Sequence, residues 1–258
     1  MREGNVFKMD KNGYYQSVRE KDHRAKLPSD MNQTVWRYMD FWKLEDMLRT
    51  KSLYLCRADQ LQLSDKYEGT YSRLWTKNME DFCYRVGQPQ QIQKEKESIE
   101  QNRRSTFINC WCMNDHDLDL MWKAYIEDPP GIAIQSTVER LEKVLDNQDK
   151  KVRELWPLDL SIVTYYDQRE NGFIDYPSFI NPFLHKDWHF ELDNEIRIIA
   201  WNKPKDKSGI KLPLDLNVLI TKIVMSPNST EADTKRVRKL MDEVGLSGVE
   251  LGFSRYRE

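Results

Sequence analysis

The chain has 258 residues, with 40 basic and 42 acidic side chains and a formal net charge of −2 at pH 7. This balance excludes nucleic-acid binding by bulk charge. Aromatic residues make up 11 % of the chain and include eight Trp, which indicates a folded rather than a disordered protein. No apolar run approaches the roughly 20 residues of a membrane span, and we expect a cytoplasmic protein without membrane contact.

The Gly, Cys and His residues exclude several familiar site types. The ten Gly form neither a G-x-G-x-x-G nor a G-x-x-x-x-G-K-[ST] phosphate loop. The four Cys include no C-x-x-C pair, so we expect reduced, buried thiols. His185 and His189 are four residues apart, but Pro182 nearby indicates a loop rather than a helix. We therefore predict no metal site.

We expect residues 1–33 to form an N-terminal arm and residues 34–258 to form a single α+β domain. Alternating apolar residues predict strands, and apolar residues three and four apart predict helices. In chain order, the expected strands are 35–38, 53–56, 106–113, 131–135, 160–166, 195–201, 219–225 and 249–253. The expected helices are 41–51, capped by Asp40, 117–127, 137–145, capped by Thr137, and 231–244.

Residues 70–104 separate two expected strands and have mostly helical character. Lys and Glu alternate from Lys94 to Glu100, as is typical of a solvated helix face. We therefore expect a helical insertion at about 70–104. Because strands and helices mix without a strict βαβ order, the sequence favours a mixed or antiparallel central sheet with surrounding helices.

Three stretches combine aromatic and charged residues at unusual density. The first is Trp36-Arg37-Tyr38, where strand alternation points Arg37 and Tyr38 to opposite faces. The second is 120–125, which is followed by the apolar strand at 131–135. The third is Lys186-Asp187-Trp188, which precedes an acidic-x-Glu-x-Arg run at 193–197.

The order of these stretches resembles a bacterial family known only as domain of unknown function 2971. Its early signature is an Asn-Asp-Pro-aromatic-Glu box, from which this chain departs at Ser64 and Lys66. Its middle is a Cys-containing strand, a Met-Trp-x-x-Tyr helix and a Gly-led strand, and its late signature is Lys, Trp and acidic-x-Glu-x-Arg. The matching residues are Asp65, Tyr67, Glu68, Gly69, Cys110, Met121, Trp122, Tyr125, Gly131, Lys186, Trp188, Asp193, Glu195 and Arg197.

The same order is similar to the plan of ADP-ribosyltransferases, which split the nicotinamide–ribose bond of NAD. The likeness consists of an Arg on a first strand, an aromatic strand after the next helix and a Glu that leads a late strand. In this chain these residues are Arg37, Tyr54 and Glu195. The resemblance implies an ADP-ribosyltransferase-like α+β fold, NAD as the substrate, and a bacterial toxin or antiphage effector that modifies protein or nucleic acid.

The resemblance also implies roles for individual residues. Glu195 would stabilise the oxocarbenium-like cation, and Asp193, two residues earlier on an extended strand, would orient the acceptor. Arg37 would hold phosphate or ribose oxygens, and Tyr38 or Tyr54 would stack on nicotinamide. The expected NAD contacts are Arg37, Tyr38, Tyr54, Asp65, Trp122, Tyr125 and Arg197.

Simpler interpretations of the same residues stay open. Glu195 and Arg197 lie two apart on one strand face, which also fits an ion pair with Arg37 or Asp65. Large aromatic side chains dominate cores by area, so the aromatic residues in question also fit a core. They are Trp122, Tyr125 and Trp188. Asp65 and Glu68 also fit caps of the helix that follows Gly69.

Two other functions stay open as well. One is a non-catalytic module of a defence system that binds a ligand or a partner protein, with the helices at 70–104 as the contact face. The other is a Mg²⁺-dependent nuclease, because carboxylates are the ligands that Mg²⁺ prefers. Its carboxylates would be Asp65, Glu68, Asp193 and Glu195.

Overall fold

The computed structural model describes residues 5–9, 15–19, 26–61, 65, 67–167, 180–202 and 207–257. Ser64 and Lys66 of the early signature lie outside the described residues. The fold is α+β with mainly antiparallel strand pairing, which confirms that part of the expectation. The described residues divide into two compact units. Unit 1 lies within Met1–Leu27, Leu55–Asn109 and Arg153–Ile210, and unit 2 within Pro28–Tyr54, Cys110–Val152 and Lys211–Glu258.

Four neighbouring strands of unit 2 lie in the order β3 (Thr34–Asp40), β6 (Gly131–Thr137), β12 (Lys222–Met225) and β13 (Glu250–Phe253). The first two pairs are antiparallel, and β12 and β13 are parallel. Apolar and mostly β-branched side chains of β6 and β12 are fully buried, which explains why these segments form central strands.

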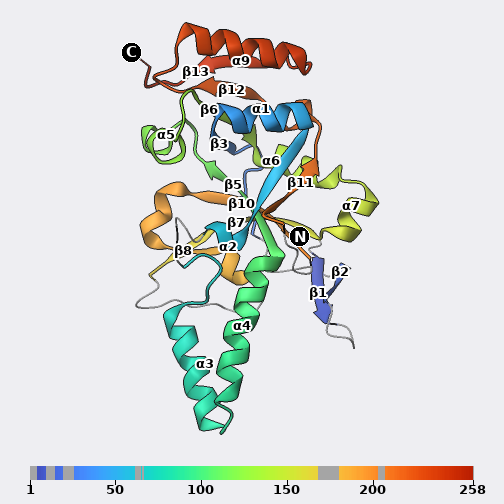
Figure 1. The fold of residues 1–258 in the computed structure, drawn as a ribbon, viewed down its shortest axis with the longest axis vertical. Helices are drawn as coiled ribbons and strands as arrows, with labels where there is room; N and C mark the ends of the chain where they lie inside the picture. Colours follow the sequence, from blue (N-terminus) through green and yellow to red (C-terminus); the bar gives the residue numbers. More distant parts are fainter. Residues whose placement is uncertain are drawn as a thin grey trace. The chain divides into compact units, whose positions relative to one another are not determined.

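Three longer helices belong to unit 2: α1 (Phe41–Thr50), α6 (Val138–Asp146) and α9 (Glu231–Glu243). Figure 1 shows them beside the strands of that unit. The hydroxyl of Thr137 accepts a hydrogen bond from the backbone in the first turn of α6, as expected. Thr230 forms a full capping box at the start of α9, so both helix starts are determined by local sequence.

Asp40 precedes α1 as expected, but its carboxylate does not cap that helix. It accepts hydrogen bonds from the backbone N–H groups of Glu127 (2.9 Å) and Asp128 (3.1 Å). It also pairs with Lys43 at 2.7 Å. The buried carboxylate therefore holds the loop after α5 (Asp119–Tyr125), and the expected side-chain cap is wrong because these loop amides use its oxygen instead.

Unit 1 contains β10 (Glu195–Trp201), whose seven residues are all buried. It pairs antiparallel with β7 (Leu158–Ile162). Two short strands, β8 (Thr164–Tyr166) and β9 (His185–Asp187), pair in parallel, and the 3-10 helix η2 (Trp188–Asp193) connects β9 to β10. This arrangement brings charged side chains from several segments to the first residues of β10.

The remaining elements are short or contribute residues to both units. β4 (Ser52–Arg57) and β5 (Thr106–Met113) pair antiparallel at Cys56 and Ile108. The others are β1 (Asn5–Met9), β2 (Tyr15–Arg19), α2 (Ala58–Leu61), α7 (Lys150–Leu155), η1 (Asn181–Phe183), β11 (Gly209–Pro213) and α8 (Leu216–Leu219). The single strand expected at 160–166 is two strands, and 219–225 contains the end of α8 before β12.

Two helices of unit 1 occupy the range of the expected insertion. α3 (Arg73–Arg85) and α4 (Gln90–Ser105) lie side by side as a hairpin in Figure 1. Cys83 is the buried residue of α3, and α4 has none. Ser72 caps α3 by accepting a hydrogen bond from the backbone of Trp75, so the alternative caps Asp65 and Glu68 are wrong. Within the described part of the chain, no helix is long and apolar enough to cross a bilayer.

Gly69 and Gly87 offer a matched test of the fold of unit 1. Both have left-handed backbone, with φ of +66° and +70°, so Ala costs about 1–2 kcal/mol at either position. A Cβ at Gly69 would lie 2.5 Å from the Phe183 ring, whereas one at Gly87 meets no described atom within 4 Å. We expect Gly69→Ala to lose a further ~1–3 kcal/mol in urea unfolding. Equal losses for the two variants would contradict the packing of Gly69 on Phe183.

Candidate functional site

Five charged side chains of unit 1 form one buried ion-pair network. The Arg197 guanidinium donates to both carboxylate oxygens of Glu68, at 2.7 and 2.9 Å, and through Nε to Glu195 Oε2 at 2.6 Å. Lys186 Nζ donates to Glu195 Oε1 and to Asp193 Oδ2, each at 2.9 Å. Side-chain exposure is 3 % for Glu195 but 15 % for Asp193. Asp193 is therefore the most accessible member of the network.

The network explains why Glu195 and Arg197 lie on β10 at alternate positions. Residues two apart in a strand share a face, so both side chains reach the same buried space. The sequence indicated ion pairs with Arg37 or Asp65. In the structure Glu195 and Arg197 instead pair with each other, Arg197 also pairs with Glu68, and Glu195 also pairs with Lys186. Arg197 Nη1 also donates to the carbonyl of Phe183 at 2.7 Å.

A tight turn presents Glu68 to Arg197. The Asp65 carboxylate accepts a hydrogen bond from the backbone of Tyr67, and the Asp65 carbonyl accepts one from Glu68 N–H, both at 2.9 Å. Gly69 follows in left-handed conformation. Asp65 is thus buried and shapes the turn, which is a structural role that the sequence did not predict.

The sequence predicted that Asp193 and Glu195 lie on one extended strand, and this prediction is wrong. Asp193 ends η2, and Asn194 between them has left-handed backbone with φ 41°. Asn tolerates this conformation better than other non-Gly residues. The alternation of side chains is therefore broken at Asn194. The two carboxylates nevertheless meet, because both bind the Lys186 ammonium.

The network shifts the pKa values of two of its three carboxyls, Glu195 and Asp193, in opposite directions. Burial would raise the pKa of Glu195, but the Arg197 and Lys186 cations outweigh burial and lower this pKa to about 2. Burial raises the pKa of Asp193, because Lys186 offsets burial only in part and the Glu195 charge adds to the rise. For Lys186, burial alone would lower the pKa, but the Glu195 and Asp193 charges raise it. The network contains three acidic side chains, Glu68, Asp193 and Glu195, but only two cations, Lys186 and Arg197.

Tyr165 contacts the backbone of the network at Glu195. The Glu195 backbone N–H donates to the Tyr165 hydroxyl at 2.8 Å. Burial and the nearby Glu195 charge raise the pKa of this phenol, so it stays neutral at physiological pH. The sequence does not indicate this role of Tyr165, because nothing in the local pattern 160–166 relates it to β10.

Two expected NAD contacts, Tyr38 and Trp122, lie in a buried cluster of unit 2. Their rings meet edge to face, with centroids 4.9 Å apart. Trp122 Nε1 donates to the Asp117 carboxylate at 3.0 Å, and the same carboxylate accepts from the Ser254 hydroxyl. Because the ring is buried and the indole N–H has a partner, this geometry supports the core interpretation of Trp122. Tyr38, for which the sequence indicated only a ligand contact, lies in the same core.

The remaining expected contacts of unit 2 are more accessible. Tyr54 and Tyr125 are exposed, and Arg37 is half-buried with Nη1 donating to the carbonyl of Cys110 at 2.7 Å. Asp65, Asp193, Glu195 and Arg197 belong to unit 1. A single cleft lined by Arg37, Tyr54 and Glu195 stays a prediction. Trp188 of the late signature is exposed in unit 1 and is not a core residue.

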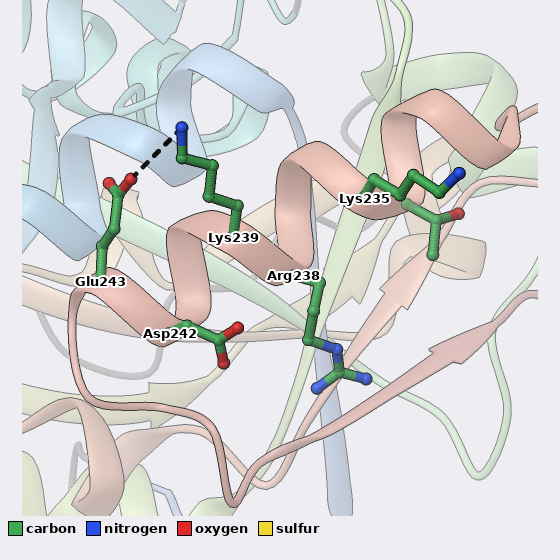
Figure 2. Close-up of a pocket in the computed structure, with 6 residues that line it drawn as sticks. Lys235, Arg238, Lys239, Asp242 and Glu243 are labelled. Carbon is green, nitrogen blue, oxygen red and sulfur yellow. Dashed lines mark ion pairs between the residues drawn. The ribbon is translucent and has the colours of Figure 1, made fainter.

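A shallow hollow of about 500 Å³ lies on the outer face of α9 and includes none of the predicted site residues. Figure 2 shows its charged side chains along that one helix, with Lys239 and Glu243 forming an ion pair at 4.0 Å. Such i,i+4 pairs are typical of a solvated helix face. The hollow therefore gives no support for a ligand site.

The described residues include no group of three His, Cys, Asp or Glu side chains that is placed to hold a metal ion. Two carboxylates of the nuclease alternative, Glu68 and Glu195, instead bind Arg197. Comparisons with protein-family models, with curated proteins and with solved structures give no match to this chain. The resemblances found in the sequence therefore stay predictions.

Replacing Glu195 by Gln tests whether the network stabilises unit 1. The change leaves Lys186 and Arg197 without their shared anion in a buried site, so we expect a loss of about 3–5 kcal/mol at pH 7 in urea unfolding. Glu191→Gln is the matched control, because Glu191 is exposed on η2, and we expect it to change stability by less than ~0.5 kcal/mol. Similar stabilities for both variants would contradict the network.

Acid unfolding gives a second test of the same group. The pKa of Glu195 is lowered in the fold from 4.5 to about 2. Its contribution to stability is therefore present above pH 4.5 and is lost as the pH falls toward 2. We expect urea midpoints of the wild type to fall across this range more steeply than those of Glu195→Gln. Parallel curves for the two proteins would show that Glu195 has an ordinary pKa.

Proposed function

We propose that this chain is an NAD-dependent ADP-ribosyltransferase-like effector, with Asp193 as the carboxylate that faces the substrate. The observation that carries the proposal is the difference in exposure among the carboxylates of the network. Glu195 and Glu68 are almost fully buried with their oxygens held by cations, and Asp193 reaches the surface. A carboxylate must contact the sugar to stabilise its cation, so Asp193 rather than Glu195 takes this role.

The charge imbalance of the network suits this role. Glu195 already has two cations, and its lowered pKa reflects them. Asp193 shares one ammonium and has a raised pKa, so its charged form is poorly stabilised in the resting protein. An oxocarbenium-like cation that develops nearby would supply the missing positive charge. The gain is then larger in the transition state than in the ground state, which is what accelerates a reaction.

Glu195 acts in this proposal as a positioning residue. Its Oε1 holds Lys186, and Lys186 in turn holds Asp193, so the buried acid determines where the accessible acid lies. The two acids of the acidic-x-Glu pattern then have different roles. The first, Asp193, contacts the substrate, and the second, Glu195, holds Asp193 in place through Lys186. An effector that modifies a macromolecule, as a toxin or in antiphage defence, agrees with such a site at the protein surface.

Asp193→Asn tests the catalytic proposal. We incubate the wild type and the variant with NAD labelled in the adenylate moiety and cell lysate, and we measure nicotinamide release and labelled product. Because the amide lacks the negative charge, we expect a loss of roughly 100-fold or more. Glu231→Gln, at an exposed position of α9 outside the site, is expected to keep full activity. A folded wild type that releases no nicotinamide and transfers no label would overturn the proposal.

The α3–α4 hairpin supports a second candidate function, a module that binds a second copy of the chain. Phe82 and Val86 are one turn apart on α3, and they are 57 % and 45 % exposed. Cations and anions alternate along α4, with Lys94, Glu95, Lys96 and Glu97 in sequence. Two antiparallel hairpins would bury Phe82 and Val86 against each other, as in a four-helix bundle.

Phe82→Glu tests this second candidate. Sedimentation velocity of the wild type at micromolar concentrations is expected to show a dimer, and the variant is expected to sediment as a monomer, because it places a charge in the buried face. Gln93→Glu, on the exposed side of α4, controls for added charge and keeps the dimer. A monomeric wild type rejects self-association and leaves the enzyme proposal unaffected.

A further inference from the structure

An acidic residue and an imidazole stand together at the start of η2, beside the ion-pair network. Asp187 is the N-cap of η2, and its Oδ1 accepts a hydrogen bond from the His189 backbone N–H at 3.2 Å. The same oxygen contacts Nδ1 of the His189 ring. The Asp187 side chain is 10 % exposed and that of His189 is 58 % exposed. A buried carboxylate thus holds a solvent-facing imidazole.

One further contact restricts the orientation of the imidazole. The Trp188 ring stacks on His189, with centroids 4.1 Å apart and an interplanar angle of 28°. Asp187 is attached to β9, whose next residue toward the N-terminus is the buried Lys186. The ring therefore has a fixed partner at Nδ1 and a fixed neighbour on one face, which distinguishes His189 from an ordinary surface histidine.

The contact with Asp187 also selects a tautomer. In a neutral imidazole one nitrogen donates and the other accepts. A carboxylate is only an acceptor, so Nδ1 of His189 carries the hydrogen, and Nε2 is left as the basic nitrogen. The carboxylate orients the ring and leaves Nε2 facing away from it, as in other Asp–His pairs. His189 is therefore equipped to act as a general base.

We propose that the Asp187–His189 dyad is the general base that activates the acceptor. This inference rests on the proposed ADP-ribosyl transfer. Nε2 of His189 removes the proton from an acceptor hydroxyl, whose oxygen then bonds to C1′ of the ribose. The C1′–N bond breaks, and nicotinamide leaves as a neutral molecule with the electron pair of that bond. The proton on His189 passes to solvent, so each transfer releases one proton and nicotinamide.

His189 and Asp193 belong to the same short helix. His189 precedes Asp193 by four residues, which corresponds to about 8 Å along the axis of a 3-10 helix and to about 120° around it. In the proposal the acceptor oxygen at His189 and the sugar at Asp193 therefore meet beside η2 rather than along one face of it. One short helix would then carry both the group that stabilises the cation and the group that activates the nucleophile.

The surroundings of His189 favour a protein hydroxyl as acceptor. The exposed Glu191 and the half-buried Asp193 give this surface negative charge, which repels the phosphate backbone of a nucleic acid. Trp188 and Leu192 are exposed large apolar side chains next to it. Such a mixture fits a polypeptide segment that presents a Ser, Thr or Tyr side chain between apolar neighbours.

The test measures transfer and nicotinamide release separately in the full chain. For His189→Gln, label transfer to protein is expected to fall by roughly 100-fold, while nicotinamide release falls much less because bond breaking depends on Asp193. Asp187→Asn keeps a capping residue but is expected to lose transfer to a similar degree, and the double variant is expected to be no worse than His189→Gln. His116→Gln, at an exposed position of unit 2, is the matched control with full transfer.

An NMR measurement of the His189 tautomer distinguishes a general base from a purely structural role of Asp187 and His189. In ¹⁵N NMR spectra at neutral pH, the His189 ring is expected in the Nδ1–H form, and Asp187→Asn is expected to shift it toward the other tautomer. Transfer by the wild type that His189→Gln leaves unchanged overturns the dyad and keeps the proposed function. Absence of any NAD turnover overturns both. If the transferred label is found in nucleic acid and not in protein, the assignment of a protein hydroxyl as the acceptor is wrong.

Discussion

The guanidinium of Arg197 is the group on which the organisation of unit 1 depends. A guanidinium cannot lose its proton in a protein, and this one is 1 % exposed. The chain must therefore bring anions and carbonyls to it, since an unpaired buried charge costs several kcal/mol. Glu68 comes from 129 residues away in the sequence, and Phe183 contributes its carbonyl. The Arg197 side chain in this way determines how the turn that carries Glu68 and the helix η1 pack against β10.

The need to pair the buried cations also explains why the carboxyls of Asp193 and Glu195 differ in pKa. Arg197 and Lys186 together neutralise two anions, but three are present. Glu195 lies between both cations and is held ionised, so Asp193 is the acid that is left short of positive charge. It is also the one at the surface. A requirement of stability thus places an under-compensated carboxylate where a ligand can reach it, and perturbed acids in such positions are common at functional sites.

The sequence predicted those parts of the fold that depend on local pattern. The seven apolar and charged residues of β10 were found with their full bounds, and Thr137 was recognised as a cap, because periodicity and capping are local properties. The site was predicted only in part. The spacing of Glu195 and Arg197 indicated an ion pair, but no single-sequence pattern relates Glu68 to Arg197. Asn194 was overlooked because a left-handed residue interrupts an alternation that otherwise looks continuous.

The fixed ends of η2 explain how a six-residue 3-10 helix can carry a site. Short helices of this type have poor hydrogen-bond geometry and do not hold their shape alone. Here the first turn is held by Asp187, which caps it from β9, and the last residue is held through the Lys186 ammonium. Both anchors are buried and adjacent in sequence. Side chains between them are therefore positioned by charges in the core of unit 1 while they remain exposed, which is the kind of support that the proposed site would need.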